Sequence, residues 1–358
     1  MRELNIVVIP GDGIGPEQTR ATLEVLRAVE RRAANFAIKL DTREAGAEHY
    51  RRTGKSMSDE TMAACKAADG VLKGPVGHPD VRAPDGTEAG VLGGVLRPAL
   101  DAYANLRPVR LYPGVRSALA DMKPGAIDYL VVRENTDGLY ASRGRGFVTR
   151  ELSVDNMVMT RKGIERVCRR AYELARRRNG APKDRVKRVT CVDKANVLRG
   201  FAFFREIFLE IGREYPDVQQ ECIYSDAAAA KLVQNPGHFD VLVMENFLGD
   251  LLSDLGAGTI GGLGMCPSGN IGDSKAYFEP IHGSAPDIAG QDKANPISMI
   301  LSAAMMLDWL DQQAAAARIR DAVDQSLADG SIRLRPDGSV ENGTQATGRL
   351  LAQRIAAS

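Results

Sequence analysis

The sequence predicts an α/β fold with a largely parallel sheet, and three observations lead to that class. Strand-like and helix-like segments alternate along the whole chain of 358 residues. Apolar residues make up 44% and charged residues 26% of the chain, which is typical of a globular protein with its own hydrophobic core. No repeat, low-complexity tail or long Pro/Ser linker interrupts the alternation. About two domains are expected for this length, joined by sheet crossovers rather than by a tether.

The first expected strand is the β-branched run at 5–9, and a glycine-rich turn leads from it into a helix at 16–32. In that helix Leu23, Leu26 and Val29 fall at helical spacing. Further compact apolar runs predict buried strands at 70–72, 129–133, 189–192, 219–223 and 241–244. Helices are expected between them at 161–178, 200–215 and 226–234. Two glycine-dense zones are expected to form hinges or site-lining loops, at 86–94 and 256–272.

Charge and cysteine content exclude several functional classes. The chain has 47 Lys and Arg against 46 Asp and Glu, so it lacks the basic excess of a nucleic-acid binder. Five scattered cysteines without a CxxC pair, and an N-terminus without a signal-peptide pattern, predict reduced thiols and a cytoplasmic location. No run approaches the roughly 18 apolar residues of a membrane span. With four histidines and no HExxH motif, any metal is expected to have oxygen ligands.

Two aspartates in ENFLGDLLSDLG are candidate metal ligands. Asp250 and Asp254 are four residues apart, so on a helix both carboxylates project from one face. A hard cation such as Mg²⁺ or Mn²⁺ would offset their repulsion, although a solvated helix face is the commoner explanation for this spacing. Asp226 begins another predicted helix and is either a third ligand or an N-cap.

Single basic residues stand where strands or turns end. Arg97 and Arg107 each precede a proline, and Arg133 ends a predicted strand. Arginines in the crevice at strand ends would hold a substrate with more than one carboxylate, but each alone is equally compatible with a surface ion pair. Lys194 directly follows a predicted strand and becomes a general base if burial near other cations lowers its pKa. Tyr140 is a candidate general acid; the alternatives are a rim salt bridge for Lys194 and a packed ring for Tyr140.

Two turns have the composition of nucleotide-binding loops. GDGIGPE at 11–17 follows a strand and precedes a helix, but Pro16 stands where the Rossmann fingerprint requires glycine. A tight turn with proline in the first helical turn is therefore favoured. The segment PIHGSAPDIAG at 280–290 predicts a phosphate or nucleotide loop, and an ordinary surface loop would have a similar composition.

Seven segments occur together in a fixed order from residue 6 to about residue 300: GDGIGPE, LDAYANLRPVRLYPGV, VVRENTDGLYA, VDKANVL, SDAAAAKLV, ENFLGDLLSDLGA and FEPIHGSAPDIAGQDKANP. This set closely resembles the β-decarboxylating dehydrogenases, which include the isocitrate, isopropylmalate, homoisocitrate and tartrate or D-malate enzymes. The resemblance implies two α/β domains flanking a cleft, with a non-Rossmann dinucleotide site. It assigns 1–102 and 261–358 to a large cofactor-binding domain and 103–260 to a small domain with the dimer interface.

The resemblance also implies NAD-dependent oxidative decarboxylation of a 2-hydroxy dicarboxylate, assisted by Mg²⁺ or Mn²⁺. The implied catalytic residues are Lys194, Tyr140 and Asp226, with Lys194 and Asp226 supplied by the other subunit of a homodimer. The implied metal ligands are Asp226, Asp250 and Asp254. The substrate would be held by Arg97, Arg107 and Arg133 beside Gly93 and Gly94. The implied cofactor residues are His282, Gly283, Ser284, Ala285, Pro286, Asp287 and Asn295.

Cofactor choice is expected to depend on Asp287. Its carboxylate would accept hydrogen bonds from the adenosine ribose hydroxyls and repel a 2′-phosphate. The NADP-using members that resemble this loop carry lysine and tyrosine at the positions of Asp287 and Ile288. The chain is therefore expected to use NAD.

The substrate's C3 substituent is expected to contact the residues before Arg97. Isocitrate enzymes carry serine and asparagine at the places of Val91 and Gly93, so their signature is missing. Isopropylmalate enzymes carry a glutamate and two leucines where this chain has Gly90, Gly93 and Gly94, so an apolar wall is not expected. The leading hypothesis is a 3-isopropylmalate-like or other 3-substituted malate, with D-malate or tartrate as the alternative. A non-catalytic regulatory subunit is disfavoured because the catalytic set is complete.

Overall fold

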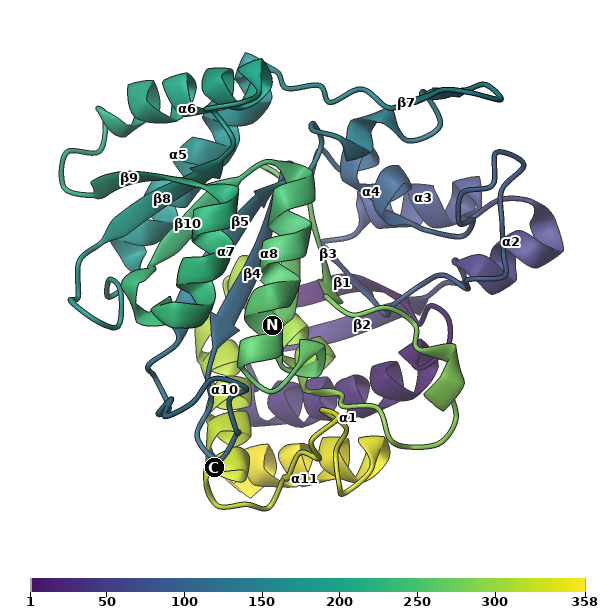
Figure 1. Cartoon of the computed structure of the whole chain (residues 1–358). Coiled ribbons are helices and arrows are strands. Elements are labelled where there is room, and N and C mark those ends of the chain that lie inside the picture. Colours follow the sequence, from purple (N-terminus) through teal and green to yellow (C-terminus); the bar gives the residue numbers. More distant parts are fainter. Residues whose placement is uncertain (1, 358) are drawn as a thin grey trace.

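The computed structural model describes residues 2–357, and one ten-stranded sheet runs through its centre (Figure 1). Its strands are β1 (Arg2–Ile9), β2 (Phe36–Thr42), β3 (Gly70–Lys73), β4 (Ala104–Arg110), β5 (Asp128–Glu134), β8 (Arg188–Asp193), β9 (Gln219–Tyr224), β10 (Val241–Met244), β11 (Pro267–Ile271) and β12 (Ala276–Pro280). Their order is β2-β1-β3-β12-β11-β4-β5-β10-β8-β9. A separate hairpin joins β6 (Phe147–Val148) to β7 (Ser153–Val154).

The sheet is parallel on both sides of an antiparallel centre. The pairs β12–β11, β11–β4 and β4–β5 are antiparallel, and the other neighbouring strands are parallel. The α/β class with a largely parallel sheet is therefore confirmed. All six predicted strands are present, whereas β2, β4, β11 and β12 were not expected.

Helices cover the sheet in groups (Figure 1). They are α1 (Gly15–Ala33), α2 (Ala47–Thr53), α3 (Asp59–Ala67), α4 (Gly93–Ala99), α5 (Arg161–Arg177), α6 (Arg199–Gly212), α7 (Ser225–Gln234), α8 (Asn246–Thr259), α9 (Ile297–Trp309), α10 (Gln313–Ala328) and α11 (Thr344–Ala357). Helix α1 packs on α11, α5 on α6, and α9 on α10. No helix within residues 2–357 has both the length and the apolar character needed to cross a membrane.

The GDGIG turn forms because only glycine fits there. Gly11 and Gly13 have φ angles of +76° and +58°, and an ideal Cβ on either would lie 2.0 Å from a backbone oxygen. Pro16 follows in the first turn of α1, where its missing N–H leaves no hydrogen bond unmade. The tight-turn interpretation is confirmed.

The second glycine zone is mostly not a loop. The structure places its beginning inside α8 and its end in β11. Gly256 is a glycine because an ideal Cβ there would lie 2.3 Å from the Tyr129 hydroxyl, so close packing of helix on strand explains it. The expectation of a site-lining loop over 256–272 is therefore wrong where the zone lies in α8 and β11, and a hinge there stays a prediction. The first zone does form a loop, which ends where α4 begins at Gly93.

Candidate active site

A cavity of about 990 Å³ opens between α4 and the segment that follows β5. Six residues predicted for the site line it: Arg97, Arg133, Tyr140, Asp250, Gly93 and Gly94. They come from α4, the end of β5, the turn after β5, and α8. The end of β5 thus delivers Arg133 to a crevice, as the sequence predicted, whereas Arg97 reaches it from α4.

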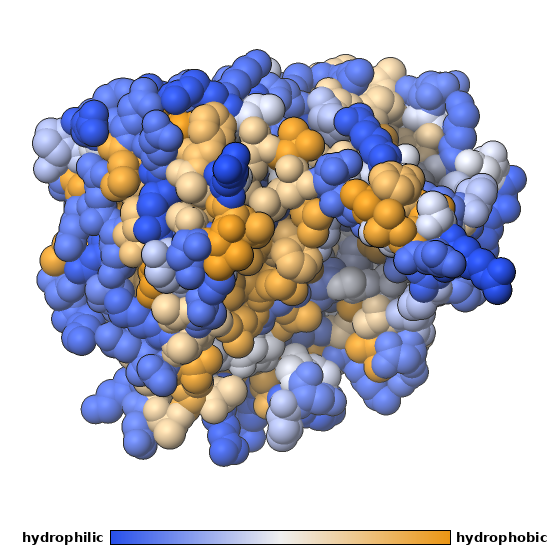
Figure 2. Space-filling view, turned by 45° about the horizontal axis from the view of Figure 1, so that its top comes forward, coloured by the Kyte–Doolittle hydropathy of each residue, from blue (hydrophilic) through white to orange (hydrophobic). Residues whose placement is uncertain are grey.

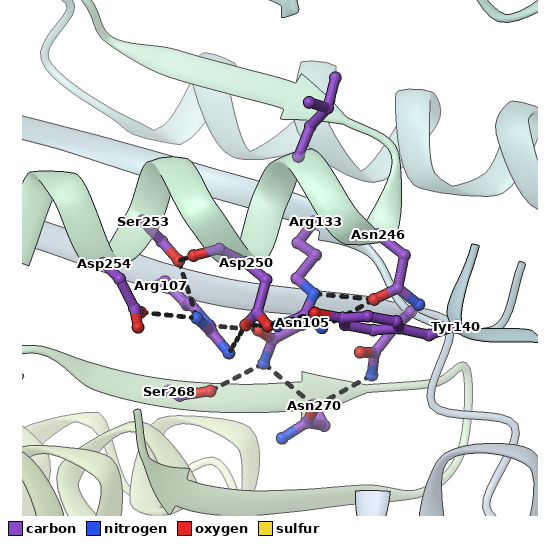
Figure 3. Close-up of polar contacts among 12 residues, drawn as sticks. Asn105, Arg107, Arg133, Tyr140, Asn246, Asp250, Ser253, Asp254, Ser268 and Asn270 are labelled. Atoms are coloured by element: carbon purple, nitrogen blue, oxygen red, sulfur yellow. Dashed lines mark hydrogen bonds and ion pairs between the residues drawn. The ribbon is translucent and has the colours of Figure 1, made fainter. Parts of the chain in front are cut away.

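Arg133 lies near the end of β5 and is fully buried beneath α8 (Figure 3). Its Nε and Nη2 donate to Asn246 Oδ1 at 3.0 and 2.7 Å, and its Nη1 donates to Asp250 Oδ1. The helix comes this close because residue 249 is glycine: an ideal Cβ on Gly249 would lie 2.5 Å from Arg133 Cγ. Burial, reinforced by the charges of Arg97 and Arg107, lowers the pKa of Arg133 to about 9.

Arg107 lies buried in β4 and links both aspartates of α8 (Figure 3). Its Nη2 is 3.2 Å from Asp250 Oδ1, and its Nη1 is 3.3 Å from Asp254 Oδ1. Burial alone would raise the pKa of Asp250, but the charges of Arg133 and Arg107 hold it below its usual range. Burial raises the pKa of Asp254 despite Arg107. The Asp250–Asp254 face is therefore turned toward guanidinium groups rather than being only a solvated surface.

Arg97 differs from the other two arginines because its Nε is buried without a hydrogen-bond partner among residues 2–357. Although burial would lower it, the nearby Tyr277 and Glu279 raise the pKa of Arg97. An ideal Cβ on Gly93 would lie 3.4 Å from Arg97 Cζ, so the glycine leaves this guanidinium uncovered. Of the three arginines, Arg97 has the most donor capacity left for a ligand.

Tyr140 completes this side of the cavity. Its hydroxyl donates to Asp250 Oδ2 at 3.0 Å, and the Arg133 guanidinium lies 5.6 Å from its ring centre. Burial and the Asp250 charge raise the pKa of Tyr140, so the phenol keeps its proton at neutral pH. A protonated phenol beside the arginines has what a general acid needs.

Lys194 and Asp226 form a second, separate group. Lys194 Nζ donates to Asp226 Oδ1 at 2.7 Å, and this hydrogen bond lowers the pKa of Asp226. Asp226 lies in the first turn of α7, where Tyr224 rather than Asp226 takes the N-cap position. Within the described residues, no three His, Cys, Asp or Glu side chains are arranged to hold a metal. Asp226 therefore does not join Asp250 and Asp254 within one chain.

The predicted cofactor segment packs against the GDGIG turn. Ile14 N–H donates to Ser284 C=O at 2.8 Å, and Ser284 Oγ donates to Gly77 C=O at 2.6 Å. Ala285 has a φ of +38°, which turns the chain so that Gly283, Pro286 and Asp287 are exposed. Asn295 is buried, and its Oδ1 accepts from Ile297 N–H at 3.0 Å. The loop thus exposes the Asp287 carboxylate and Gly283, while Ser284 and Asn295 anchor it to the protein.

The sequence did not point to Lys73, Glu279 or Asn105, whose side chains surround or orient the predicted arginines. Lys73 Nζ lies 2.6 Å from Glu279 Oε2 in a buried ion pair, and Lys73 with Arg97 keeps the pKa of Glu279 below its usual range despite burial. Lys73 directly follows the strand predicted at 70–72, a signal similar to the one that pointed to Arg133. Asn105 accepts from Arg107 Nε at 2.7 Å and donates to Ser268 Oγ at 2.7 Å, with no comparable sequence signal.

The cavity wall near the paired glycines is not free of apolar groups. Val91 and Val95 line it together with Gly93 and Gly94. Arg143 also lines the cavity, and its Nη2 donates to the Glu88 carbonyl oxygen. The expected lack of an apolar wall is therefore corrected: valines contribute one, because the first turn of α4 carries Val95 into the cavity.

Fold and site together define an α/β protein with an arginine-lined cavity beside the end of β5. The model of the isocitrate/isopropylmalate dehydrogenase family matches residues 5–340. The chain belongs to this family and is a decarboxylating dehydrogenase.

Individual relatives carry different substrate names. The 3-isopropylmalate/3-methylmalate dehydrogenase of Methanocaldococcus jannaschii is 43% identical over 318 residues, which is 88% of this chain and 89% of the relative. The 3-isopropylmalate dehydrogenase of Thermobifida fusca is 42% identical and covers 99% of this chain and 98% of its own. The crystal structure of an isocitrate dehydrogenase from Methylococcus capsulatus has a TM-score of 0.86 at 38% identity, over 99% of this chain and 100% of that one.

Proposed function

We propose that the chain catalyses the NAD-dependent, Mg²⁺- or Mn²⁺-assisted oxidative decarboxylation of a 3-substituted malate of the 3-isopropylmalate type. The observation that carries this proposal is a cavity lined by Arg97 and Arg133 beside Tyr140 and Asp250, with Arg107 paired to Asp250. Relatives named for 3-isopropylmalate, one of them also for 3-methylmalate, support a substrate with an alkyl group at C3. D-malate or tartrate is the alternative substrate.

The acidic residues fit the proposed metal. Asp250 and Asp254 offer carboxylate oxygens from one face of α8, the hard donors that Mg²⁺ and Mn²⁺ prefer. Asp226 of a second copy would complete the set. A divalent cation bound there supplies Lewis-acid polarisation of the substrate's C2 oxygen.

The chain's own residues divide the remaining work. Arg97, Arg107 and Arg133 bind the two carboxylates, and Lys194 accepts the proton of the C2 hydroxyl. NAD, when bound, supplies the acceptor for the hydride that leaves C2. The carboxylate on C3 then leaves as CO₂, and Tyr140 donates its phenolic proton to C3. Its raised pKa suits Tyr140 to that last step because the proton is present at neutral pH.

The 282–287 loop fits a dinucleotide without a 2′-phosphate. Asp287 is exposed, and an ideal Cβ on Gly283 would meet no described atom within 4 Å, so the loop has room for a ligand along its surface. The carboxylate would accept from the ribose hydroxyls and repel a phosphate. We expect kcat/KM to be at least about tenfold higher with NAD⁺ than with NADP⁺. A higher kcat/KM with NADP⁺ would show the assignment to be wrong.

A homodimer with shared active sites is part of the proposal. Exposed apolar side chains on this chain offer surfaces for a second copy: Val233 on α7, Leu251 on α8, and Phe147 and Val148 on the β6–β7 hairpin. Figure 2 shows apolar residues gathered in a band on one face of the molecule. In such a dimer Lys194 and Asp226 would reach the partner's cavity.

The predicted domain boundaries, with breaks after residues 102 and 260, belong to the same proposal. One apolar core cluster lies entirely between Tyr103 and Val243, inside the proposed small domain. A second cluster consists of residues from 7–102 with Tyr277 added, inside the proposed large domain. The cytoplasmic location stays a prediction.

The experiment is a screen for NADH formation with Mn²⁺ over 3-alkylmalates, D-malate, tartrate and isocitrate. The proposal predicts the highest kcat/KM for a 3-alkylmalate. A higher value with D-malate or tartrate would select the alternative. No NADH with any of them would indicate a non-catalytic subunit.

A further inference from the structure

Gln18 directly follows the GDGIGPE segment in α1, and it is 1% exposed. Its Nε2 donates to the Asn295 carbonyl oxygen at 2.9 Å and lies 3.2 Å from His282 Nε2. Its Oε1 is buried without a partner among the described residues. The reversed amide would place an oxygen against the Asn295 carbonyl oxygen, so this carbonyl fixes which end of the amide is NH₂.

The fixed amide determines which ring nitrogen of His282 carries the proton. An NH₂ group only donates, so His282 Nε2 must accept. The ring proton then lies on Nδ1, which is 2.9 Å from the Gly283 carbonyl oxygen and can donate to it. Protonating the ring would place an Nε2–H against the NH₂ group of Gln18. The contact therefore favours neutral imidazole.

The other groups around the ring do not reverse this preference. Lys73 on β3 disfavours a second positive charge, and Glu279 on β12 favours it. Glu279 is already paired with Lys73, with 2.6 Å between Nζ and Oε2. Half-buried in the loop, His282 has its pKa lowered first by burial and also by Lys73.

We propose that Gln18 is a positioning residue of the cofactor site: it locks His282 as the neutral Nδ1–H tautomer and so keeps dinucleotide affinity independent of pH. A charged imidazolium in this loop would attract the phosphates of a dinucleotide and make binding tighter in acid. A neutral ring removes that dependence across the range where a free histidine titrates. The ligand rests on the proposed function, whereas the tautomer rests only on contacts within this chain.

Two measurements on the whole protein test the inference. Nitrogen-15 NMR of labelled histidines, with His282 assigned by its absence in His282→Gln, reports the tautomer between about pH 5 and pH 8.5. Calorimetry of NAD⁺ binding at about pH 6 and pH 8 reports the affinity. For the wild type we expect Nδ1–H throughout and a Kd that changes less than about twofold. In Gln18→Glu the new carboxylate, turned away from the Asn295 carbonyl oxygen, accepts from Nε2–H, so the ring charges and Kd becomes about tenfold tighter at the lower pH.

Thr22→Val is the matched control because Thr22 lies one turn further along α1 and its hydroxyl donates to the Gln18 carbonyl oxygen at 2.8 Å. It should match the wild type in both measurements. An Nε2–H tautomer in the wild type, or an identical His282 titration in wild type and Gln18→Glu, would overturn the inference. Absence of NAD⁺ binding by a wild type with the expected tautomer would instead overturn the proposed cofactor and the affinity part of this inference.

Discussion

Two clusters of charged side chains in the proposed site differ in how far they are buried and in how their charges are compensated. The first group is Arg107, Arg133 and Asp250, and the second group is Lys194 and Asp226. Arg107 and Arg133 lie under α8, where the carboxylate of Asp250 and amide and hydroxyl groups of the same helix compensate the guanidinium groups. Lys194 and Asp226 form an ion pair with each other, and their side chains are 29% and 71% exposed. A buried charge must be compensated for the chain to fold, whereas an exposed ion pair adds little to folding. We infer that the first group belongs to the fold as well as the site, and that the second acts outside its own chain.

Replacing Lys194 is expected to have the largest effect. Lys194→Met removes the proposed base, so turnover should fall by about 10³-fold or more. The midpoint of thermal unfolding should stay at the wild-type value because the lost ion pair is at the surface. Steady-state NADH formation and calorimetry measure the two quantities. Turnover near the wild-type level would remove Lys194 from the mechanism.

Removing one carboxylate from each group compares their contributions to folding. Asp250→Asn leaves the buried Arg133 guanidinium without its anion and Arg107 with Asp254 alone, and we expect the free energy of unfolding to fall by about 3 kcal/mol. Asp226→Asn, the matched control, should leave it unchanged. Urea unfolding without added metal measures both. Equal losses in the two variants would contradict the distinction between the groups.

A single methyl group can disturb the first group without changing any charge. Gly249→Ala would push against Arg133 Cβ and Cγ, which an ideal Cβ approaches to 2.6 and 2.5 Å. We expect the KM for substrate to rise about tenfold as the guanidinium shifts, with a smaller change in kcat. Gly258→Ala, on the same helix with no described atom within 4 Å of its Cβ, should leave KM unchanged. A KM that rises equally in both variants would point to the helix rather than to Arg133.

The sequence was sufficient for much of the first group. Arg133 ends a β-branched run, and the parallel sheet places such ends at a crevice. The spacing of Asp250 and Asp254 put both on one face of α8, as the structure has them. Local pattern was enough here because each residue is positioned by the element that carries it.

The groups that orient these residues were not predictable in this way. Arg107 is aimed by Asn105, which bonds to Ser268 and, at 3.0 Å, to Asn270 on β11. β11 reads PSGNI, with proline, glycine and asparagine in place of an apolar alternation, so its pairing with β4 has no local signal. The β11–β4 pair in the antiparallel centre joins residues more than 150 positions apart, which no periodicity reports.

The central claim is that one active site takes residues from two chains, and complementation tests it most directly. Lys194→Met and Tyr140→Phe are each expected to be inactive alone. When they are refolded together in equal amounts, shared sites predict that half the dimers contain one intact site, giving about a quarter of wild-type turnover. A mixture as inactive as its two parents would show that each chain builds its site alone.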